Sequence, residues 1–281
     1  MVSKINKGEI KISVILSTFN RPRALKLVLE SLCNQKDCNF EIIVADDGSE
    51  ATTKIVIEET SRDYSNVCIH HVWHENKGFR LAKIRNLAVL KSTGDYLIFL
   101  DGDCVPSPNF ITKHRDLMER GWVVYGQRIL ASKDYTSLLI EDQSITLRAS
   151  FWTLLNLVVL WRAGFINRFL PAVKFPNFFW RKFSPKKWEN IRGCNLAMWR
   201  YDYINVNGSD ESFEGWGAED KDLVVRLINN GILLKNGSFY SYVLHLWHLH
   251  EPREKSKENM IIVNRRLNDK VIFPSKGIEN V

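Results

Sequence analysis

Cysteine is scarce in this 281-residue chain and follows none of the common spacing patterns. There are five cysteines, at Cys33, Cys38, Cys68, Cys104 and Cys194. An odd number without a C-x-x-C pair argues against both a disulfide framework and a zinc knuckle. The cysteines therefore indicate a reducing compartment.

Long hydrophobic runs and targeting segments are missing as well. The sequence has no run of about 20 apolar residues, so a conventional membrane-spanning helix is not expected. Residues 1–8 lack the apolar segment that secretory signals carry. We therefore expect a cytoplasmic protein, with peripheral attachment to the inner face of the cytoplasmic membrane as the open alternative.

Acidic residues are absent from residues 144–188, which carry eight lysines and arginines around a dense apolar block at 151–161. One interpretation is a core helix followed by a basic loop. The other is an interfacial segment that places aromatic rings among anionic lipid headgroups. Nucleic-acid binding is disfavoured, because the aromatic residues cluster with aliphatic ones instead of forming a stacking ladder.

The overall composition permits a large folded domain with an anionic partner. Apolar residues make up 45% of the chain, and its formal net charge is +7. The length suits one large α/β domain, or a domain with an appendage. The basic balance favours a partner such as a nucleotide phosphate or a membrane surface.

The first hundred residues alternate between apolar runs and helical spacing. Strands are expected at 12–18, 40–45, 67–72 and 96–100, and helices at 23–33, 52–60 and 81–91. This rhythm predicts a parallel, nucleotide-binding type of sheet, in which ligands bind beyond the carboxyl ends of the strands.

Acidic pairs follow two of the expected strands. Asp46 and Asp47 end one strand, and Asp101 and Asp103 end the strand at 96–100. Buried carboxylates are costly unless they are paired or bind a metal, so Asp-x-Asp at a strand end suggests a divalent cation that serves a phosphate. A solvated turn is the alternative interpretation, since one such pattern is expected by chance.

An unusual glycine-flanked tryptophan, Trp216, precedes a second acidic pair. Its flat ring suits the face of a sugar, and Glu219 and Asp220 follow at the start of an expected helix. A carboxylate kept ionised beside an apolar platform suits a general base that acts on a hydroxyl. An ordinary acidic first turn of a helix is the alternative.

Two histidines near the C-terminus have the spacing of metal ligands. His245 and His248 flank Trp247, and imidazole together with carboxylate suits Mn²⁺ or a similar ion. We rank His248 first and His245 second. The segment 76–86 places a glycine and basic groups before a helix, but it lacks the spacing of a phosphate-binding loop or dinucleotide fingerprint, so kinases and NAD enzymes are poorly supported.

Several of these motifs together resemble a known family. SVILSTFNR (13–21), DDGS (46–49), the 76–86 segment and Asp101-x-Asp103 are similar to family 2 glycosyltransferases of the GT-A fold. Gly193-x-Asn195, GWGAED (215–220) and His245-x-x-His248 resemble the C-terminal half of the β-1,4-galactosyltransferase type. The resemblance covers roughly 11–127 and 191–252 and leaves 128–190 unmatched.

The resemblance implies an α/β GT-A fold, with a mostly parallel central sheet and flanking helices in a single catalytic domain. It implies a nucleotide-sugar half at 1–127, a basic and aromatic insertion at 128–190, an acceptor-binding and catalytic half at 191–252, and a polar C-terminal tail at 253–281. The implied reaction is inverting, metal-dependent transfer from a nucleotide-sugar, UDP-linked by preference, to a saccharide hydroxyl in cell-surface polysaccharide or lipopolysaccharide synthesis.

Residue roles follow from the same resemblance. The donor would be bound by Thr18, Phe19, Arg21, Asp46, Arg80, Arg85 and Asp101. The divalent metal, Mn²⁺ before Mg²⁺, would be bound by Asp103, His248 and His245. The acceptor would be bound by Trp216, Glu219 and Asn195, with Asp220 as the base. Lys221 stands where the family carries a further acid, which leaves the acceptor preference open.

Two other classes remain possible from the residues alone. One is a non-catalytic sugar- or lipid-binding module of the same fold, for which a broken acidic pair would be expected. The other is a metal-dependent nucleotidyltransferase, which needs neither the tryptophan platform nor the second acidic pair. The expected partners are a nucleotide-sugar and a saccharide or lipid-linked saccharide acceptor, with an anionic membrane surface as a further candidate and no nucleic acid.

Overall fold

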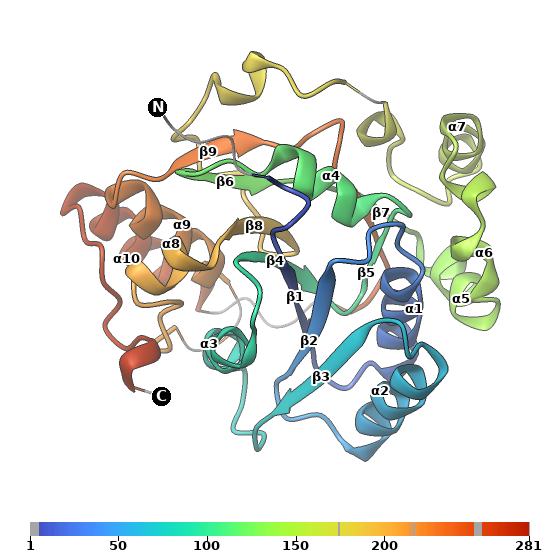
Figure 1. The fold of residues 1–281 in the computed structure, drawn as a ribbon, viewed down its shortest axis with the longest axis horizontal. Helices are drawn as coiled ribbons and strands as arrows, with labels where there is room; N and C mark the ends of the chain where they lie inside the picture. Colours follow the sequence, from blue (N-terminus) through green and yellow to red (C-terminus); the bar gives the residue numbers. More distant parts are fainter. Residues whose placement is uncertain (1–5, 174, 214, 216, 250–254, 281) are drawn as a thin grey trace.

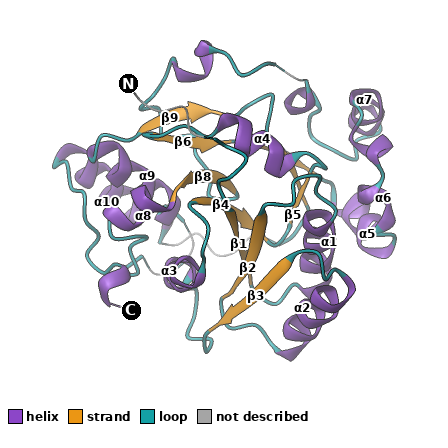
Figure 2. Ribbon diagram, in the orientation of Figure 1, coloured by secondary structure: helices purple, strands orange, loops and turns teal. Residues whose placement is uncertain are grey.

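The central feature of the computed structural model is a seven-stranded sheet in the order β3-β2-β1-β4-β8-β6-β9 (Figures 1 and 2). The model describes residues 6–173, 175–213, 215, 217–249 and 255–280. The strands of this sheet are β1 (Ile12–Thr18), β2 (Phe40–Asp46), β3 (Cys68–Trp73), β4 (Tyr96–Asp101), β6 (Trp122–Tyr125), β8 (Asn195–Trp199) and β9 (Leu233–Asn236).

The first four strands are parallel, as the alternation in the sequence predicts. β1 lies between β2 and β4 and pairs with both in parallel, and β3 pairs with β2 in the same sense. β8 is antiparallel to β4 and to β6, so the sheet is mixed at its second half. Every residue of β1 and β2 is buried, which is typical of parallel strands covered on both faces.

Helices cover the two faces of the sheet. α1 (Pro22–Cys33) and α2 (Ala51–Asp63) lie on one side, and α3 (Leu81–Lys91) lies on the other (Figure 1). Alternate residues of β1 divide between the two cores: Val14 and Leu16 belong to the α1 side, and Ile15 belongs to the α3 side. This alternation follows from the two-residue period of a strand. The predicted α/β class with flanking helices is confirmed.

A small second sheet joins the two halves of the chain. It contains β5 (Cys104–Pro106), β10 (Tyr242–His245) and β7 (Gln127–Leu130), in that order. Neither β5 nor β7 was predicted from the sequence. The antiparallel pairing of β5 with β10 places His245 opposite Cys104. Two residues, Gly102 and Asp103, separate Cys104 from the end of β4, so this pairing brings the histidine segment to the acidic loop.

The middle of the chain contains α4 (Phe110–Leu117), α5 (Lys133–Glu141), α6 (Ser144–Leu147) and α7 (Leu154–Arg162), and three single 3-10 turns. In the acid-free segment, Leu157 and Leu160 of α7 are buried in the core on the α1 side, whereas Leu155 is 76% exposed. Part of this segment is therefore core, as one interpretation predicts, and other side chains of the same helix are exposed to solvent. None of the helices in the described part of the chain is long and apolar enough to cross a membrane.

One basic residue of the insertion, Arg181, is buried and so is not available for lipid contact. Its side chain is 1% exposed and donates hydrogen bonds to backbone carbonyls, among them those of Asn236 and Ser238, both at 2.8 Å. A buried guanidinium is stable when its donors are satisfied, and carbonyls satisfy them here. Lys182, its neighbour, forms an ion pair with Glu119 at 2.6 Å.

The C-terminal segment is more than a polar surface tail. After α8 (Arg200–Asn205), α9 (Glu219–Asn229) packs against α10 (Ser256–Asn268), and Val263 of α10 is fully buried. Arg266 of α10 donates to Asp222 at 2.7 Å and to Asp210 at 2.5 Å. A buried ion-pair network ties this helix to the half of the protein that carries the acidic pair of α9.

Replacing Arg266 with glutamine is expected to destabilise the protein by about 3–5 kcal/mol, because buried Asp210 loses its ion pair. Asp222 loses one of two ion pairs and keeps the one with Arg226 at 2.8 Å. The adjacent Arg265 is a matched control, since its side chain is 83% exposed and pairs only with the exposed Asp269. Arg265→Gln is expected to cost less than about 1 kcal/mol. Chemical denaturation of both variants measures the difference, and equal stability of the two would contradict the prediction.

Candidate active site

A cavity of about 580 Å³ opens at the carboxyl ends of β1, β2 and β4. The strand order places β2 and β4 on either side of β1, so the acids that follow them meet there, as the sequence predicts. Asp47, Asp101 and Asp103 line the cavity on this side, and Glu219 and Asp220 line it on the other. Of the three acidic pairs singled out in the sequence, two face the cavity with both members and the third faces it through Asp47 alone.

The acidic loop after β4 lies close against β1. Gly102 donates its N–H to the carbonyl of Ser17 at 2.7 Å, and a Cβ at Gly102 would lie 3.0 Å from the same oxygen. Glycine between the two acids allows this close approach. Arg21 Nη1 lies 2.9 Å from Asp103 Oδ2, and Arg85 Nη2 lies 3.1 Å from Asp101 Oδ1.

Most predicted donor residues line the cavity, and two do not. Thr18, Phe19, Arg21, Arg85 and Asp101 line it. Asp46 is 1% exposed and lies outside the lining, with Oδ2 2.9 Å from His71 Nε2. Arg80 is also outside the lining, and its guanidinium donates to the carbonyl of Glu75.

Asp47, which the sequence analysis did not select, faces the cavity in place of Asp46. It accepts from the backbone N–H of Arg80 at 2.9 Å, and His74 Nε2 lies 2.6 Å from its other oxygen. Adjacent residues at a strand end point in opposite directions, so the pair could supply only one cavity residue. Nothing in the sequence indicates which of the two aspartates faces the cavity.

The predicted metal ligands converge at the junction of the two sheets. Asp103 Oδ2 lies 3.3 Å from His248 Nε2, and Asp103 Oδ1 lies 3.8 Å from His245 Nε2. The Nδ1 of His248 lies 2.6 Å from the carbonyl of Leu249, which leaves Nε2 directed at the carboxylate. Burial, followed by the charge of Arg128, lowers the pKa of His245 to about 3.

These groups fit a divalent cation. At neutral pH His245 is an uncharged imidazole, which is the form that binds metals. One carboxylate and two imidazoles form a donor set of oxygen and nitrogen that suits Mn²⁺. The distances from the carboxylate of Asp103 to the two imidazoles place the three side chains around one point.

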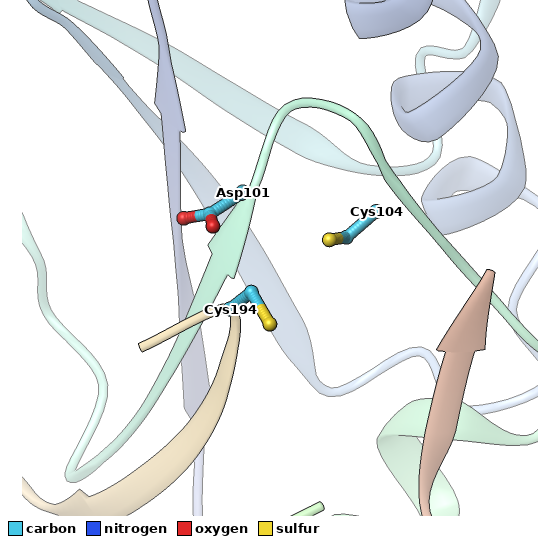
Figure 3. A group of neighbouring side chains, drawn as sticks. All are labelled: Asp101, Cys104 and Cys194. Atoms are coloured by element: carbon cyan, nitrogen blue, oxygen red, sulfur yellow. The ribbon is translucent and has the colours of Figure 1, made fainter. Parts of the chain in front are cut away.

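A second group of potential ligands lies behind the acidic loop. Figure 3 shows Asp101 at the end of β4, with Cys104 and Cys194 beside it. The ligand atoms of these three residues lie within 4.8 Å of one another. Burial raises the pKa of the Cys104 thiol well above its usual value, so the thiol stays protonated. Sulfur ligands suit soft metals, and a Mn²⁺-type ion is better served by Asp103 and the histidines.

The acidic pair of α9 is fixed by a constrained loop. Gly217 and Ala218 both have positive φ, 110° and 77°, immediately before the helix. Asp220 Oδ2 accepts the N–H of Gly193 at 2.6 Å. Trp216, the predicted floor of the acceptor site, lies outside the described residues. The loop therefore delivers Asp220 to the cavity wall beside the segment that leads into β8.

Glu219 is held in a less polar environment than Asp220. Its Oε1 lies 3.9 Å from Arg85 Nη1, and its Oε2 has no hydrogen-bond partner within the described residues. Burial, followed by the charge of Asp220, raises the pKa of Glu219 to about 7. The two neighbouring carboxyls thus differ in environment, and a protonated Glu219 is able to donate a hydrogen bond to a ligand.

The raised pKa of Glu219 predicts a pH-dependent stability. The folded protein binds this proton more tightly than the unfolded chain does, so the stabilisation is complete below about pH 4.5 and is lost as the pH rises through about 7. Glu219→Gln is expected to remove this dependence, on the order of 1–3 kcal/mol. Denaturation at pH 4.5 and 8 tests it, and identical pH slopes for variant and wild type would contradict it.

Asn195 does not lie in the candidate acceptor site. Its side chain is 1% exposed in β8, with Oδ1 2.9 Å from His114 Nε2 and Nδ2 donating to the carbonyl of Gln127. The buried amide is fully used in joining the two sheets. The motif around Gly193 contributes to the cavity through Gly193 and its neighbours, and Asn195 has a structural position.

The central sheet is mostly parallel, carries acids and histidines at its carboxyl edge, and faces a further acidic pair on a helix. This arrangement defines a glycosyltransferase of the GT-A fold. The protein-family model for glycosyl transferase family 2 matches residues 13–170, and the chain belongs to this family. A second model, described as the N-terminal domain of galactosyltransferase, matches residues 175–249. Together they also extend over most of the region 128–190 that the sequence resemblance had left unmatched.

Curated relatives are longer than this chain. It is similar to chondroitin synthase of Escherichia coli, with 26% identity over 80% of this chain and 33% of the relative. It is similar to hyaluronan synthase of Pasteurella multocida, with 28% identity over 89% of this chain and 25% of the relative. Validoxylamine A glucosyltransferase of Streptomyces hygroscopicus is 27% identical over 88% of this chain and 57% of the relative. The chain thus spans about a quarter to a little over half of these relatives.

Solved structures share the fold at low identity. TarS residues 1–349 of Staphylococcus aureus in complex with UDP superimposes with a TM-score of 0.57 at 18% identity, covering 96% of this chain and 68% of that one. GalNAc-T7 with UDP, GalNAc and Mn²⁺ superimposes with a TM-score of 0.60 at 15% identity, covering 93% of this chain and 50% of that one. At these identities the likeness supports the fold alone.

Proposed function

We propose that this protein transfers a sugar from a UDP-linked donor to a hydroxyl of a saccharide acceptor, with inversion and with a divalent metal, in the synthesis of a cell-surface polysaccharide or lipopolysaccharide. One observation carries the proposal: Asp103 with His245 and His248 on one wall, and Asp220 on the other, line the same cavity. This arrangement supports the assignment of one wall to the leaving diphosphate and of the other to a base.

The chemistry follows from this placement. The acceptor hydroxyl attacks the anomeric carbon from the face opposite the diphosphate, so a new C–O bond forms as the old one breaks. Asp220, oriented by the N–H of Gly193, takes the hydroxyl proton. A divalent ion held by Asp103, His245 and His248 would supply Lewis-acid neutralisation of the departing diphosphate. Arg21 adds positive charge on the same side.

The comparisons support parts of this proposal to different degrees. Two of the solved structures contain UDP, and another, a mannosyltransferase of Pyrobaculum calidifontis, contains GDP-Man and Mn²⁺. The preference for uridine therefore rests on the motif resemblance. The chondroitin and hyaluronan synthases among the relatives support a polysaccharide product.

A panel of nucleotide-sugars tests the reaction. With Mn²⁺ present, one UDP-sugar is expected to raise the melting temperature and to be hydrolysed slowly to UDP and sugar, and EDTA is expected to stop both effects. Protection without any turnover, with or without saccharide acceptors, would favour the non-catalytic binding module. Release of pyrophosphate from a nucleoside triphosphate and a sugar phosphate would favour a nucleotidyltransferase.

We further propose that the outer face of α7 contacts an anionic membrane that carries the acceptor. Leu155 and Val159 lie one helical turn apart and are 76% and 55% exposed, and Arg162 continues the same face. α7 lies at the periphery of the molecule (Figure 1). The absence of acids from 144–188 gives this surface the charge that anionic headgroups attract, at about 1 kcal/mol for each basic group.

Flotation with anionic vesicles tests this surface. Wild-type protein is expected to float with the vesicles at low salt, and Leu155→Glu with Val159→Glu is expected to reduce the bound fraction at least about tenfold. Ile261→Glu is the matched control, because Ile261 is 69% exposed on α10. A wild-type protein that stays in the soluble fraction at low salt, or equal losses in both variants, would contradict membrane contact through α7.

A further inference from the structure

Arginines around the cavity fall into two groups. Arg21 is paired with Asp103, and Arg85 is paired with Asp101 and lies 3.9 Å from Glu219. Arg128 and Arg192 also line the cavity, but neither forms an ion pair with an acid in the described part of the chain. Asp101 and Asp103 are thus engaged with one set of arginines, and the other set has no ion-pair partner among the described residues.

Arg168 of the acid-free segment joins the unpaired group. The chain just before it is attached to β7: Asn167 N–H donates to the carbonyl of Leu130 at 3.0 Å, and its side-chain oxygen accepts the N–H of Leu130 at 2.8 Å. Partial burial and then the charges of Arg128 and Arg192 lower the pKa of Arg168. Because Leu130 and Arg128 lie two residues apart on β7, the hydrogen bonds of Asn167 bring the segment of Arg168 alongside Arg128.

This arginine cluster, Arg128, Arg168 and Arg192, flanks the reacting groups. Arg192 directly precedes Gly193, whose N–H orients Asp220. Arg128 lies on β7, which pairs with the strand that ends at His245. Arg192 thus adjoins the segment that orients the proposed base, and Arg128 adjoins the histidine strand; both line the cavity, and Arg168 lies outside its lining.

Three mutually repelling guanidinium groups beside a substrate cavity are stabilised by an anion. An arginine offers planar, two-pronged hydrogen bonding that matches a carboxylate or a phosphate. The neighbouring segment 144–188 has no acid to supply that charge, and Asp101 and Asp103 are paired with other arginines. A bound anionic substrate would supply the negative charge.

We propose that Arg128, Arg168 and Arg192 bind a carboxylate or phosphate group carried by the saccharide acceptor. This inference rests on the proposed glycosyl transfer and adds the chemical class of the acceptor to it. The donor diphosphate is the other anion that enters the cavity. The position of Arg192 beside the segment that orients the base, and the origin of Arg168 in the insertion, favour the acceptor.

Binding measurements on the Mn²⁺–UDP-loaded protein test the cluster without requiring turnover. The probes are methyl β-glucuronide, glucose 6-phosphate and the neutral methyl β-glucoside, titrated by calorimetry or saturation-transfer NMR. We expect at least one charged probe to bind about tenfold or more tightly than the glucoside, as charge-assisted hydrogen bonds predict. A tighter glucuronide identifies a carboxylate acceptor, and a tighter sugar phosphate identifies a phosphorylated one.

Substitutions then assign the effect to the cluster. Arg192→Gln and Arg168→Gln are each expected to lower the affinity for the charged probe about tenfold and to leave the affinity for UDP within about twofold. Arg192→Lys keeps the charge and is expected to lose less than Arg192→Gln. Arg162→Gln is the matched control, since Arg162 is an exposed arginine of the same insertion.

Two results would overturn the proposal. Equal binding of charged and neutral probes would show that the cluster does not select an anionic saccharide. A larger loss of UDP affinity than of probe affinity in the Arg192 and Arg168 variants would assign the cluster to the donor diphosphate. If UDP itself fails to bind with Mn²⁺, the proposed donor is wrong, while a preference for charged saccharides in the free protein still supports the cluster.

Discussion

Replacing Asp220 with asparagine is expected to lower kcat at least about 100-fold while leaving the affinity for UDP within a few-fold. A general base commonly contributes a factor of about 10² to 10⁴, and an amide cannot take the hydroxyl proton. The proposed ligands of the donor's diphosphate and metal, Asp103 with His245 and His248, lie on the opposite wall of the cavity from Asp220. The loss is therefore expected in turnover and not in donor binding.

The substitution is expected to cost the fold about one hydrogen bond, on the order of 1 kcal/mol. Asp220 accepts the N–H of Gly193 at 2.6 Å and that of Lys221 at 2.8 Å, and an asparagine oxygen can keep one of the two. Glu258→Gln is the control, because it removes a carboxylate from an exposed position in the first turn of α10. Thermal unfolding should show both variants close to wild type. More than about a tenth of wild-type kcat in Asp220→Asn would remove Asp220 from the role of base.

Glu219 offers a second carboxyl next to the proposed base, and the two roles can be separated. Burial and the charge of Asp220 raise the pKa of Glu219 to about 7, so Glu219 is partly protonated near neutral pH. If it holds the acceptor as a hydrogen-bond donor, Glu219→Gln should raise KM for the acceptor more than it lowers kcat. A loss confined to kcat in Glu219→Gln, with activity retained in Asp220→Asn, would exchange the two assignments.

The parallel half of the fold could be predicted because its strands are long and buried. β1 was predicted at its observed bounds and α3 likewise, since a mostly apolar run of seven residues and a helical repeat of eleven leave little choice. β5, β7 and β9 have only three or four residues each. Runs this short have no measurable period, and their pairing with distant partners decides their structure.

The C-terminal helix was misread for a related reason. Its polar composition indicates a surface helix, but Arg266 is buried with Asp210 and Asp222. Buried charges of opposite sign that lie dozens of residues apart look, in the sequence, the same as exposed ones. Only the tertiary contact reveals that they neutralise one another.

The candidate site shows the same division between local and tertiary information. The acids at the ends of β2 and β4 could be assigned to one edge, because parallel strands bring their carboxyl ends together. The choice of Asp47 over Asp46, and the burial of Asn195 in β8, depend on side-chain direction and on partners from other strands. Arg128 and Arg192 lie outside the family motifs, and their convergence required the fold.

Removing the proposed metal ligands is expected to have an effect as large as removing the base. Asp103 provides the carboxylate between His245 and His248, and alteration of a ligand should weaken metal affinity by at least the 10- to 100-fold that supporting residues contribute. We expect Asp103→Asn and His248→Ala to weaken Mn²⁺ binding in the presence of UDP by about 100-fold or more. EDTA should abolish transfer in wild type, and Mn²⁺ or Mg²⁺ should restore it.

Calorimetric titration of Mn²⁺ into the UDP-bound protein separates this effect from catalysis. His70→Ala is the matched control, since it removes a half-buried imidazole of β3 that does not line the cavity. Arg21 complicates Asp103→Asn, because this variant also leaves a guanidinium without its 2.9 Å partner. His248→Ala keeps that pair, so a loss of Mn²⁺ affinity in this variant cannot come from Arg21. Full activity in EDTA, or unchanged Mn²⁺ affinity when Asp103→Ala and His248→Ala are combined, would contradict a metal site at this junction.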